Sequence, residues 1–128
     1  MASYLLDTHA FLWWLGDEAQ LGAEARSEIA DSANEIFVSA ATAWEISLKR
    51  HIGKLEAPGD IEDWIAGSGF SDLAIEVEHA VQAGGLPNHH KDPFDRMLVA
   101  QAQLEGITLV ARDDEIAKYD VEILDAGA

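Results

Sequence analysis

Short hydrophobic runs alternate along the chain with longer segments in which apolar residues recur at helical spacing. The hydrophobic runs predict strands at 3–6, 36–38, 73–75, 108–111 and 121–124. The helical spacing predicts helices through 11–15, 21–33, 39–52, 61–66, 78–83 and 92–105, and residues 113–115 open a last helical turn. Strands that alternate with helices are typical of an α/β fold with a central, mainly parallel sheet.

Single residues at the helix ends support these boundaries. Ser39 is placed to cap the helix that follows it, and Gly53 is placed to end that helix. Asp92 followed by proline is a common helix start, and Gly106 suits the end of the same helix. The 128 residues contain no repeat, low-complexity tract or long linker, so we expect a single domain over residues 1–128.

Two aspartates follow predicted strands. Asp7 comes directly after the first strand, and Asp113 comes after the strand at 108–111 and Arg112. Asp7 is also well placed to cap the next helix, whereas Asp114 could cap the last helical turn and leave Asp113 without a structural duty. Because ligands of parallel sheets bind beyond the carboxyl ends of the strands, Asp7 and Asp113 are candidates for a common site.

Glu45 borders the apolar face of its predicted helix. Ala41 lies four residues before it, and Leu48 and Ile52 lie three and seven residues after it. Burying a carboxylate without a partner is costly. Glu45 is therefore either a core residue paired with an arginine or a backbone donor, or part of a functional site.

Asp95 repeats this pattern on the helix that begins at Asp92. Leu98 and Val99 lie three and four residues after Asp95, which directs its side chain inward, whereas Asp92 is better used as the cap. An acidic residue in the first turn favours the helix dipole by about 0.3–1 kcal/mol. That effect would explain one aspartate at the helix start, but the presence of both Asp92 and Asp95 suggests that one of them has another role.

Together the four acids predict a divalent metal site. Two carboxylates about 4 Å apart repel by about 4 kcal/mol at an effective dielectric constant of about 20, and we expect no lysine beside them to compensate. The chain has no cysteine, which excludes thiolate-bound zinc, and hard oxygen ligands favour Mg²⁺ or Mn²⁺. A GxxxxGK[ST] loop is absent, so nucleoside triphosphate chemistry is not indicated.

Charge and composition limit the partners. A net charge of −16 argues against nucleic-acid binding through overall electrostatics. The basic residues instead gather in two groups, Lys49–Lys54 and His89–Arg96, each of which is either a local contact for RNA or a solvated helix end. The sequence shows no run of 18 apolar residues and no secretory signal, so we expect no membrane contact and a cytoplasmic location.

Four segments resemble the acidic motifs of the PIN-domain family, in the same order. They are Leu5–Leu15 (LLDTHAFLWWL), Ser39–Ile46 (SAATAWEI), His90–Ala102 (HKDPFDRMLVAQA) and Leu109–Asp113 (LVARD). Within the family, the resemblance is to the VapC-like toxins of bacterial type II toxin–antitoxin pairs. It covers nearly the whole chain, and its third segment is long and specific.

The resemblance implies a three-layer α/β/α PIN-like fold and RNA cleavage by an Mg²⁺- or Mn²⁺-dependent endoribonuclease. It also implies a homodimer and neutralisation by a small cognate antitoxin. The catalytic and metal-binding acids of the family carry over to Asp7, Glu45, Asp95 and Asp113. The serine or threonine that often precedes the fourth aspartate is missing here, and the nearby hydroxyls that could serve the site are those of Thr8 and Ser39.

Basic and apolar side chains suggest where partners bind. Lys49, one turn beyond Glu45, and Arg96, next to Asp95, are expected to contact RNA phosphates. The antitoxin is expected to insert a basic side chain among the acids, because a guanidinium can bind two carboxylates. The exposed apolar surface that holds the antitoxin is expected to include members of one aromatic set, which consists of Phe11, Trp13, Trp14 and Trp64.

Two alternatives stay open at this point. A Mg²⁺-dependent phosphotransfer domain, such as a receiver or a haloacid-type phosphatase, also has acids at strand ends, but His9 stands where such phosphatases have a second aspartate. A catalytically silent PIN fold that only binds a protein partner is the other alternative, and the presence of all four acids argues against it. A metal-dependent nuclease assay separates the three functions.

Overall fold

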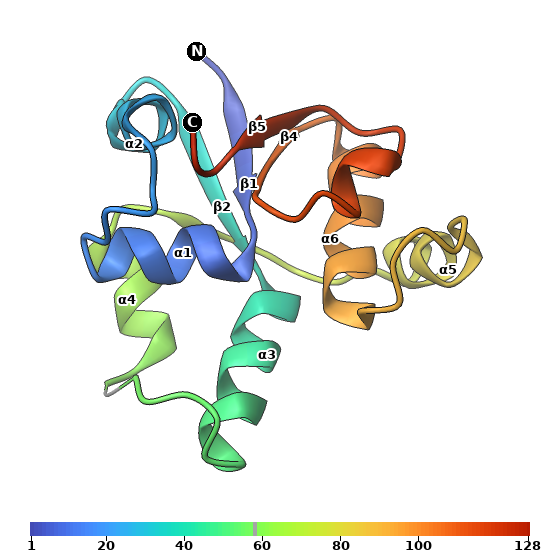
Figure 1. Ribbon diagram of the computed structural model, residues 1–128, viewed down its shortest axis with the longest axis horizontal. Helices are drawn as coiled ribbons and strands as arrows, with labels where there is room; N and C mark the ends of the chain where they lie inside the picture. The colour runs from blue at the N-terminus through green and yellow to red at the C-terminus, as the bar shows by residue number, and fades with distance from the viewer. Residues whose placement is uncertain (58) are drawn as a thin grey trace.

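Each of the first three strands is followed by two α-helices in the computed structural model, which describes residues 1–57 and 59–128 (Figure 1). The strands are β1 (Ser3–Leu6), β2 (Glu35–Ser39), β3 (Ser71–Leu73), β4 (Thr108–Ala111) and β5 (Ile123–Asp125). The α-helices are α1 (Thr8–Leu15), α2 (Ala23–Ala30), α3 (Ala40–His51), α4 (Ile61–Gly67), α5 (Val77–Gly85) and α6 (Pro93–Glu105). A single 3₁₀ turn, η1 (Ile116–Lys118), precedes β5.

The strands form one parallel sheet in the order β3-β2-β1-β4-β5. Leu6 of the central strand β1 pairs with Val38 of β2 on one side and with Val110 of β4 on the other. From the central strand β1 the chain adds β2 and then β3 on one side of the sheet. It then crosses to the other side of β1 and adds β4 and β5. The carboxyl ends of β1 and β4 therefore flank the switch point, where open parallel sheets bind their ligands.

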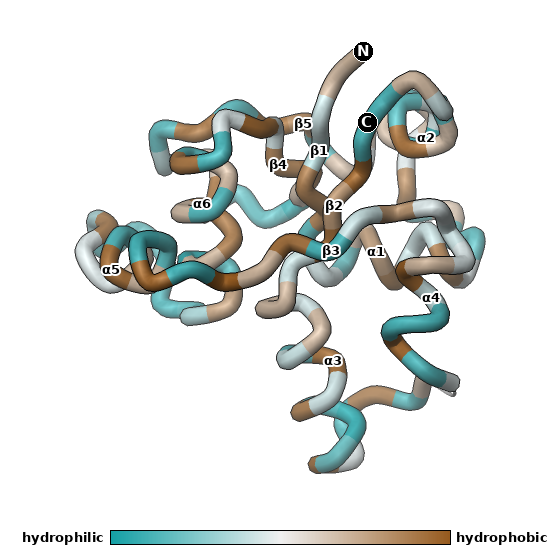
Figure 2. Tube along the Cα trace, turned by 180° about the vertical axis from the view of Figure 1, so that it is seen from behind, coloured by the Kyte–Doolittle hydropathy of each residue, from teal (hydrophilic) through white to brown (hydrophobic). Residues whose placement is uncertain are grey.

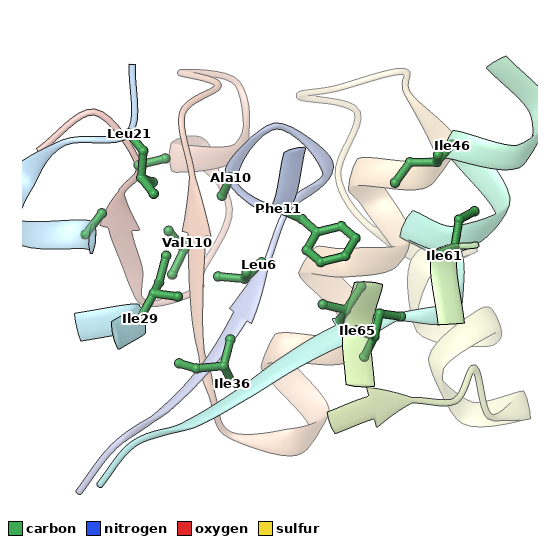
Figure 3. Packing of buried hydrophobic residues seen from close by; sticks show 13 residues of the cluster. Leu6, Ala10, Phe11, Leu21, Ile29, Ile36, Ile46, Ile61, Ile65 and Val110 are labelled. Atoms are coloured by element: carbon green, nitrogen blue, oxygen red, sulfur yellow. The ribbon is translucent and has the colours of Figure 1, made fainter. Parts of the chain in front are cut away.

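Successive residues of β1 face two separate cores. Leu6 faces a core shared with α1, α2 and α4, in which Figure 3 shows Phe11 beside the sheet and α4. Leu5 faces the opposite core, where it packs with Leu98 of α6 and Leu109 of β4. Helix α5 packs against α6 (Figure 1). Helices on both faces of the sheet give the three layers of the predicted α/β/α fold.

Local hydrogen bonds explain where the site-bearing helices begin and end. Ser39 Oγ accepts from the backbone N–H of Ala41 at 3.0 Å and caps α3. Asp92 Oδ1 accepts from the N–H of Phe94 at 2.8 Å and caps α6. Gly106 ends α6 with φ of 68°, a left-handed conformation that glycine adopts without strain. All three are the residues expected from the sequence.

Some boundaries differ from the prediction by one to a few residues. Strand β3 begins at Ser71, two residues before the predicted 73–75, because its register is set by pairing with Phe37 of β2. Strand β5 is likewise displaced from 121–124, since it pairs with β4 through Ile123. The register of these edge strands follows the neighbouring strand and not their own hydrophobic residues.

Helix α3 is less buried than its sequence suggested. It extends from the carboxyl end of β2 beyond the sheet, and Figure 2 shows hydrophobic positions on this projecting part. Ala41 and Ile46 are buried, but Leu48 is 41% exposed and Ile52 just beyond the helix is 53% exposed. The face that borders Glu45 therefore joins the core only in its first half. None of the helices in the described ranges is long and apolar enough to span a membrane.

Candidate active site

Asp7 occupies the switch point of the sheet. Its backbone N–H donates to the carbonyl of Val110 on β4 at 2.9 Å, and its Oδ1 accepts from the N–H of Ala10 at 2.7 Å. The residue is 2% exposed. Asp7 therefore caps α1, as its position suggested, and the cap fixes a buried carboxyl group at the end of β1.

The environment of Asp7 disfavours its charge. The pKa of Asp7 is raised to about 7, mainly by burial and also by the nearby charge of Asp95. The cap hydrogen bond and the charge of His9 lower the pKa, but they do not offset burial. A cation bound beside this carboxylate would remove much of the penalty, since an opposite charge favours the ionised form.

Glu45 is buried on α3, and both of its oxygens have partners. Oε1 accepts from the hydroxyl of Thr8 at 2.5 Å, and Oε2 accepts from the ammonium of Lys49 at 2.6 Å. This hydrogen bond is the main cause that raises the pKa of Lys49. The expectation that no lysine compensates the acids is therefore wrong, because Lys49 lies one helical turn beyond Glu45 and reaches it.

Asp95 lies in the first turn of α6, with its side chain 17% exposed. Burial raises the pKa of Asp95 to about 6, the charges of Asp92 and Glu45 add to this rise, and His90 opposes it. Asp92, by contrast, uses its Oδ1 to cap the helix. The structure thus separates the two aspartates as the helical spacing predicted, with Asp92 as the cap and Asp95 among the other acids.

Asp113 joins the site through a histidine. Nε2 of His90 lies 2.8 Å from Asp95 Oδ2 and 3.2 Å from Asp113 Oδ2. Asp113 is the more exposed of the two carboxylates, and its Oδ1 accepts from the N–H of Glu115 at 2.8 Å. The four predicted acids are therefore gathered at one edge of the sheet, with His90 between two of them.

His90 is the site residue that the sequence did not reveal. The sequence places it in a basic group and at the start of the third family-like segment, but gives it no role in the site. A histidine two residues before a helix-capping aspartate was the available signal, because the residues before a cap lie close to the first turn, where Asp95 is.

The two candidate hydroxyl residues have different partners. Thr8 donates to Glu45, so it contacts the acidic cluster directly. Ser39 donates to Oε1 of the buried Gln101 at 2.6 Å, and within the described residues it bonds no carboxylate. Ser39 therefore acts on the site through the start of α3, which it caps.

Both basic residues expected to contact RNA have partners within the protein. Lys49 is bonded to Glu45, as described above. Arg96 is bonded by its two terminal nitrogens to backbone carbonyls and to one hydroxyl. These acceptors belong to Ala83, Leu86, Pro87, His90 and Tyr119. Arg96 thus ties the end of α5 and the following loop to α6, which is a structural duty at the edge of the site.

The aromatic surface expected to hold the antitoxin is less open than predicted. Phe11 is fully buried, and Trp13, Trp14 and Trp64 are half-buried against the core. Trp44 on α3 is instead 59% exposed. The strongly exposed tryptophan is therefore Trp44 on α3, which was not in the predicted aromatic set.

The donor atoms at the site fit a divalent metal. His90, Asp95 and Asp113 each offer one ligand atom, and these atoms lie within 4.8 Å of one another. Asp7 and Glu45 are coupled electrostatically to Asp95. Carboxylate oxygens with one imidazole nitrogen suit Mn²⁺ and related ions, and carboxylates alone suit Mg²⁺.

Two curated proteins are similar to this chain in sequence. The chain is 25% identical over 122 residues to Ribonuclease VapC22 of Mycobacterium tuberculosis, with 93% of each chain covered. It is 34% identical over 71 residues to Ribonuclease VapC16 of the same organism, which covers 51% of this chain and 50% of that protein.

Solved structures share the fold. VapBC2 from Rickettsia felis, bound to a DNA fragment, matches with a TM-score of 0.70 and 14% identity over 95% of this chain and 97% of that chain. A toxin–antitoxin complex from Klebsiella pneumoniae matches with a TM-score of 0.66 and 18% identity over 96% and 97%. The phosphotransfer alternative is therefore set aside. The PIN domain family model matches residues 4–122, and the chain accordingly belongs to the PIN domain family.

Proposed function

We propose that this chain is a metal-dependent endoribonuclease, a hydrolase of RNA phosphodiester bonds that acts as the toxin of a toxin–antitoxin pair. The observation that carries the proposal is the gathering of four acids at the switch point of the sheet. They are Asp7, Glu45, Asp95 and Asp113. The names of the two curated relatives, both VapC ribonucleases, support the same activity.

The four acids are the residues that would hold Mg²⁺ or Mn²⁺. The bound ion would supply an acidified water molecule and stabilise the negative charge that develops on the phosphate. The protein fixes the acids beforehand: the cap of α1 positions Asp7, and the first turn of α6 positions Asp95. The two partners of Glu45, Thr8 and Lys49, set the orientation of its carboxylate. Such advance positioning lowers the cost of reaching the transition state.

Cleavage of RNA by aspartate variants tests the assignment of the site. Asp95→Asn should abolish Mn²⁺-supported cleavage and leave the protein folded. Asp92→Asn is the matched control, because asparagine also caps helices and the loss of stability should be about 0.5 kcal/mol or less. Complete loss in both variants would contradict the division of roles. A wild-type protein that cleaves no RNA with any divalent metal would favour the silent binding module.

Arg112 is the basic residue that the structure favours for a substrate phosphate. It is exposed next to Asp113, its backbone lies close enough to Asp7 to lower the pKa of that carboxyl group, and its guanidinium lies 5.7 Å from the centre of the Trp13 ring. Within the described residues it forms no ion pair, whereas Lys49 is paired. The contact with RNA expected of Lys49 and Arg96 is untested, and their partners within the protein make Arg112 the better candidate.

Salt dependence of RNA binding distinguishes these basic residues. Binding is measured in EDTA, which prevents cleavage. Arg112→Ala should lower the slope of log affinity against log salt by about 0.7, the value for one phosphate of a single strand. Lys49→Ala should leave the slope unchanged. A lower slope in Lys49→Ala together with an unchanged slope in Arg112→Ala would instead indicate that Lys49 contacts the phosphate.

A small antitoxin is the first protein partner that we propose. Several solved structures with this fold are toxin–antitoxin complexes, which supports such a partner here. A basic side chain of the antitoxin would bind the buried carboxylates at the switch point and exclude the metal. The antitoxin gene is expected next to this one, so the two products should copurify as an inactive complex. A copurified complex that cleaves RNA at the full rate would contradict the blocking of the site.

A second copy of the chain is the other partner that we propose. Trp44 and Leu48 on α3 and Ile52 just beyond it are exposed at four-residue intervals, and Val77 and Val81 are exposed on α5. Exposed apolar patches of this kind often mark protein interfaces. Sedimentation should therefore show a dimer that Trp44→Ala weakens, and a monomer at all concentrations would contradict it. The proposed activity requires RNA in the same compartment, which keeps the cytoplasm as the expected location.

A further inference from the structure

His90 holds a fixed position between two of the acids. Its backbone N–H donates to the hydroxyl of Tyr119 at 2.9 Å, and its carbonyl accepts from Arg96 at 3.3 Å. Tyr119 is itself buried and donates to the carbonyl of Pro87 at 2.8 Å. The loop that carries His90 is therefore held by two side chains from other elements, and the ring is presented to Asp95 and Asp113 by the fold.

The spacing of the donor atoms matches the edges of a metal coordination shell. Nε2 of His90 is 2.8 Å from Asp95 Oδ2 and 3.2 Å from Asp113 Oδ2. Ligand atoms at about 2.1 Å from an octahedral metal lie about 3.0 Å apart along each edge. The three atoms can therefore contact one ion with little movement of their side chains.

The contacts of Nδ1, the other ring nitrogen of His90, allow Nε2 to act as a metal ligand. A ligating Nε2 needs its lone pair, so the proton must lie on Nδ1. Nδ1 of His90 has a single contact, a long one of 3.4 Å from the N–H of Asp92. Moving the proton to Nδ1 gives up this weak hydrogen bond and the one from Nε2 to Asp95, and a metal bound to both Nε2 and Asp95 would replace the second.

A second histidine in a similar cluster shows the contrast. His79 lies with Glu78 and Glu105 in another group of close donor atoms. Its Nδ1 accepts from the N–H of Glu76 at 2.9 Å, which keeps the proton on Nε2, and Nε2 is 2.9 Å from Glu105. Nδ1 of His79 thus caps the start of α5 and Nε2 joins α5 to α6, so both nitrogens are engaged and this cluster is structural.

We propose that Nε2 of His90 is a ligand of the metal held by Asp95 and Asp113, and that this nitrogen makes the site favour Mn²⁺ over Mg²⁺. The preference follows from chemistry, since imidazole suits transition metals whereas Mg²⁺ prefers oxygen ligands. The inference rests on the proposed function, because it concerns the metal of the same site. His90 thereby joins the four acids as a fifth ligand.

Pulsed electron paramagnetic resonance of bound Mn²⁺ tests the proposal directly. The wild-type protein with one equivalent of MnCl₂ should show echo modulation from a coordinated ¹⁴N nucleus. His90→Gln should lose this modulation and still bind Mn²⁺ through the carboxylates. His89→Gln is the matched control: it changes the neighbouring exposed histidine and should keep the modulation. Bound Mn²⁺ without ¹⁴N modulation in the wild type, or modulation that persists in His90→Gln, would overturn the proposal.

Metal affinity gives a second measurement. His90→Gln should weaken Mn²⁺ binding by at least about tenfold, the lower range for disturbing a metal site, and should weaken Mg²⁺ binding less. An unchanged ratio of the two dissociation constants would overturn the proposed preference. RNA cleavage by the wild type, measured on the same sample, separates this inference from the proposed function. Metal-dependent cleavage without ¹⁴N coordination refutes the inference alone, whereas a protein that binds no Mn²⁺ and cleaves no RNA with any divalent metal refutes both.

Discussion

Replacing Asp7 with asparagine should stabilise the metal-free protein while it removes a proposed metal ligand. Asp7 is 2% exposed, and burial raises its pKa from 3.8 to about 7. Asparagine keeps a side-chain oxygen that can accept from Ala10, and it caps helices about as well as aspartate. Asp7→Asn therefore removes the unfavourable buried charge and keeps the start of α1.

The size and sign of the effect follow from the pKa. The rise from 3.8 to about 7 corresponds to at most about 4 kcal/mol, since one pKa unit is about 1.4 kcal/mol. The folded state binds this proton more tightly than the unfolded state. The free energy of unfolding of the wild type therefore falls as the pH rises from about 4 to about 7 and is level above that range. The increase in the free energy of unfolding caused by Asp7→Asn should be small near pH 4 and largest above pH 7.

Guanidinium chloride unfolding in EDTA, at about pH 5 and about pH 8, measures this gain. We expect the gain at the higher pH to exceed the gain at the lower pH by about 2–3 kcal/mol. Asp60→Asn is the matched control, because Asp60 also caps a helix, through Glu62 at 3.0 Å, but is exposed. It should show no such difference. An equal loss of stability at both pH values in Asp7→Asn would refute the reasoning from buried charge.

Four further substitutions test other parts of the structure. Thr8→Val removes the hydroxyl that donates to the buried glutamate of α3, and it should cost about 1–3 kcal/mol in unfolding and reduce cleavage. Arg96→Ala should cost at least about 2 kcal/mol, since the guanidinium bonds four carbonyls; an unchanged free energy of unfolding would give it a surface role. Gly22→Ala places a methyl group 1.8 Å from the carbonyl oxygen of Ala128 and should destabilise the fold by about 1–3 kcal/mol in thermal unfolding. Gly84→Ala, which meets nothing within 4 Å in helix α5, should instead stabilise it by about 0.5–1 kcal/mol.

The sequence predicted those parts of the fold that depend on local chemistry. The strand before Asp7, the cap at Ser39 and the proline start after Asp92 all rest on a few adjacent residues. The exposure of Leu48 and Ile52 was not predictable, because it depends on how far α3 extends beyond the sheet. Hydrophobic spacing indicates an apolar face, but the neighbouring elements decide how much of that face is covered.

The acids of the site were predictable, whereas only some of their partners were. Asp7 and Asp113 follow strands and Glu45 and Asp95 lie on helix faces, so topology alone brings them together. The position of His90 depends on a loop that is held by long-range hydrogen bonds, to which no local pattern corresponds. The pair of Glu45 and Lys49 was within reach of the sequence, since residues four apart on a helix are neighbours.

A single Mn²⁺ titration, with RNA cleavage and Mn²⁺ occupancy recorded on the same sample, tests the central claim most directly. The claim is that the acids around Asp95 form a metal site that performs the cleavage. We predict no cleavage in excess EDTA, and a cleavage rate that rises in parallel with occupancy as Mn²⁺ is restored. Asp95→Asn should lose both the bound ion and the cleavage. Undiminished cleavage in excess EDTA, or full cleavage while the site is unoccupied, would contradict the claim.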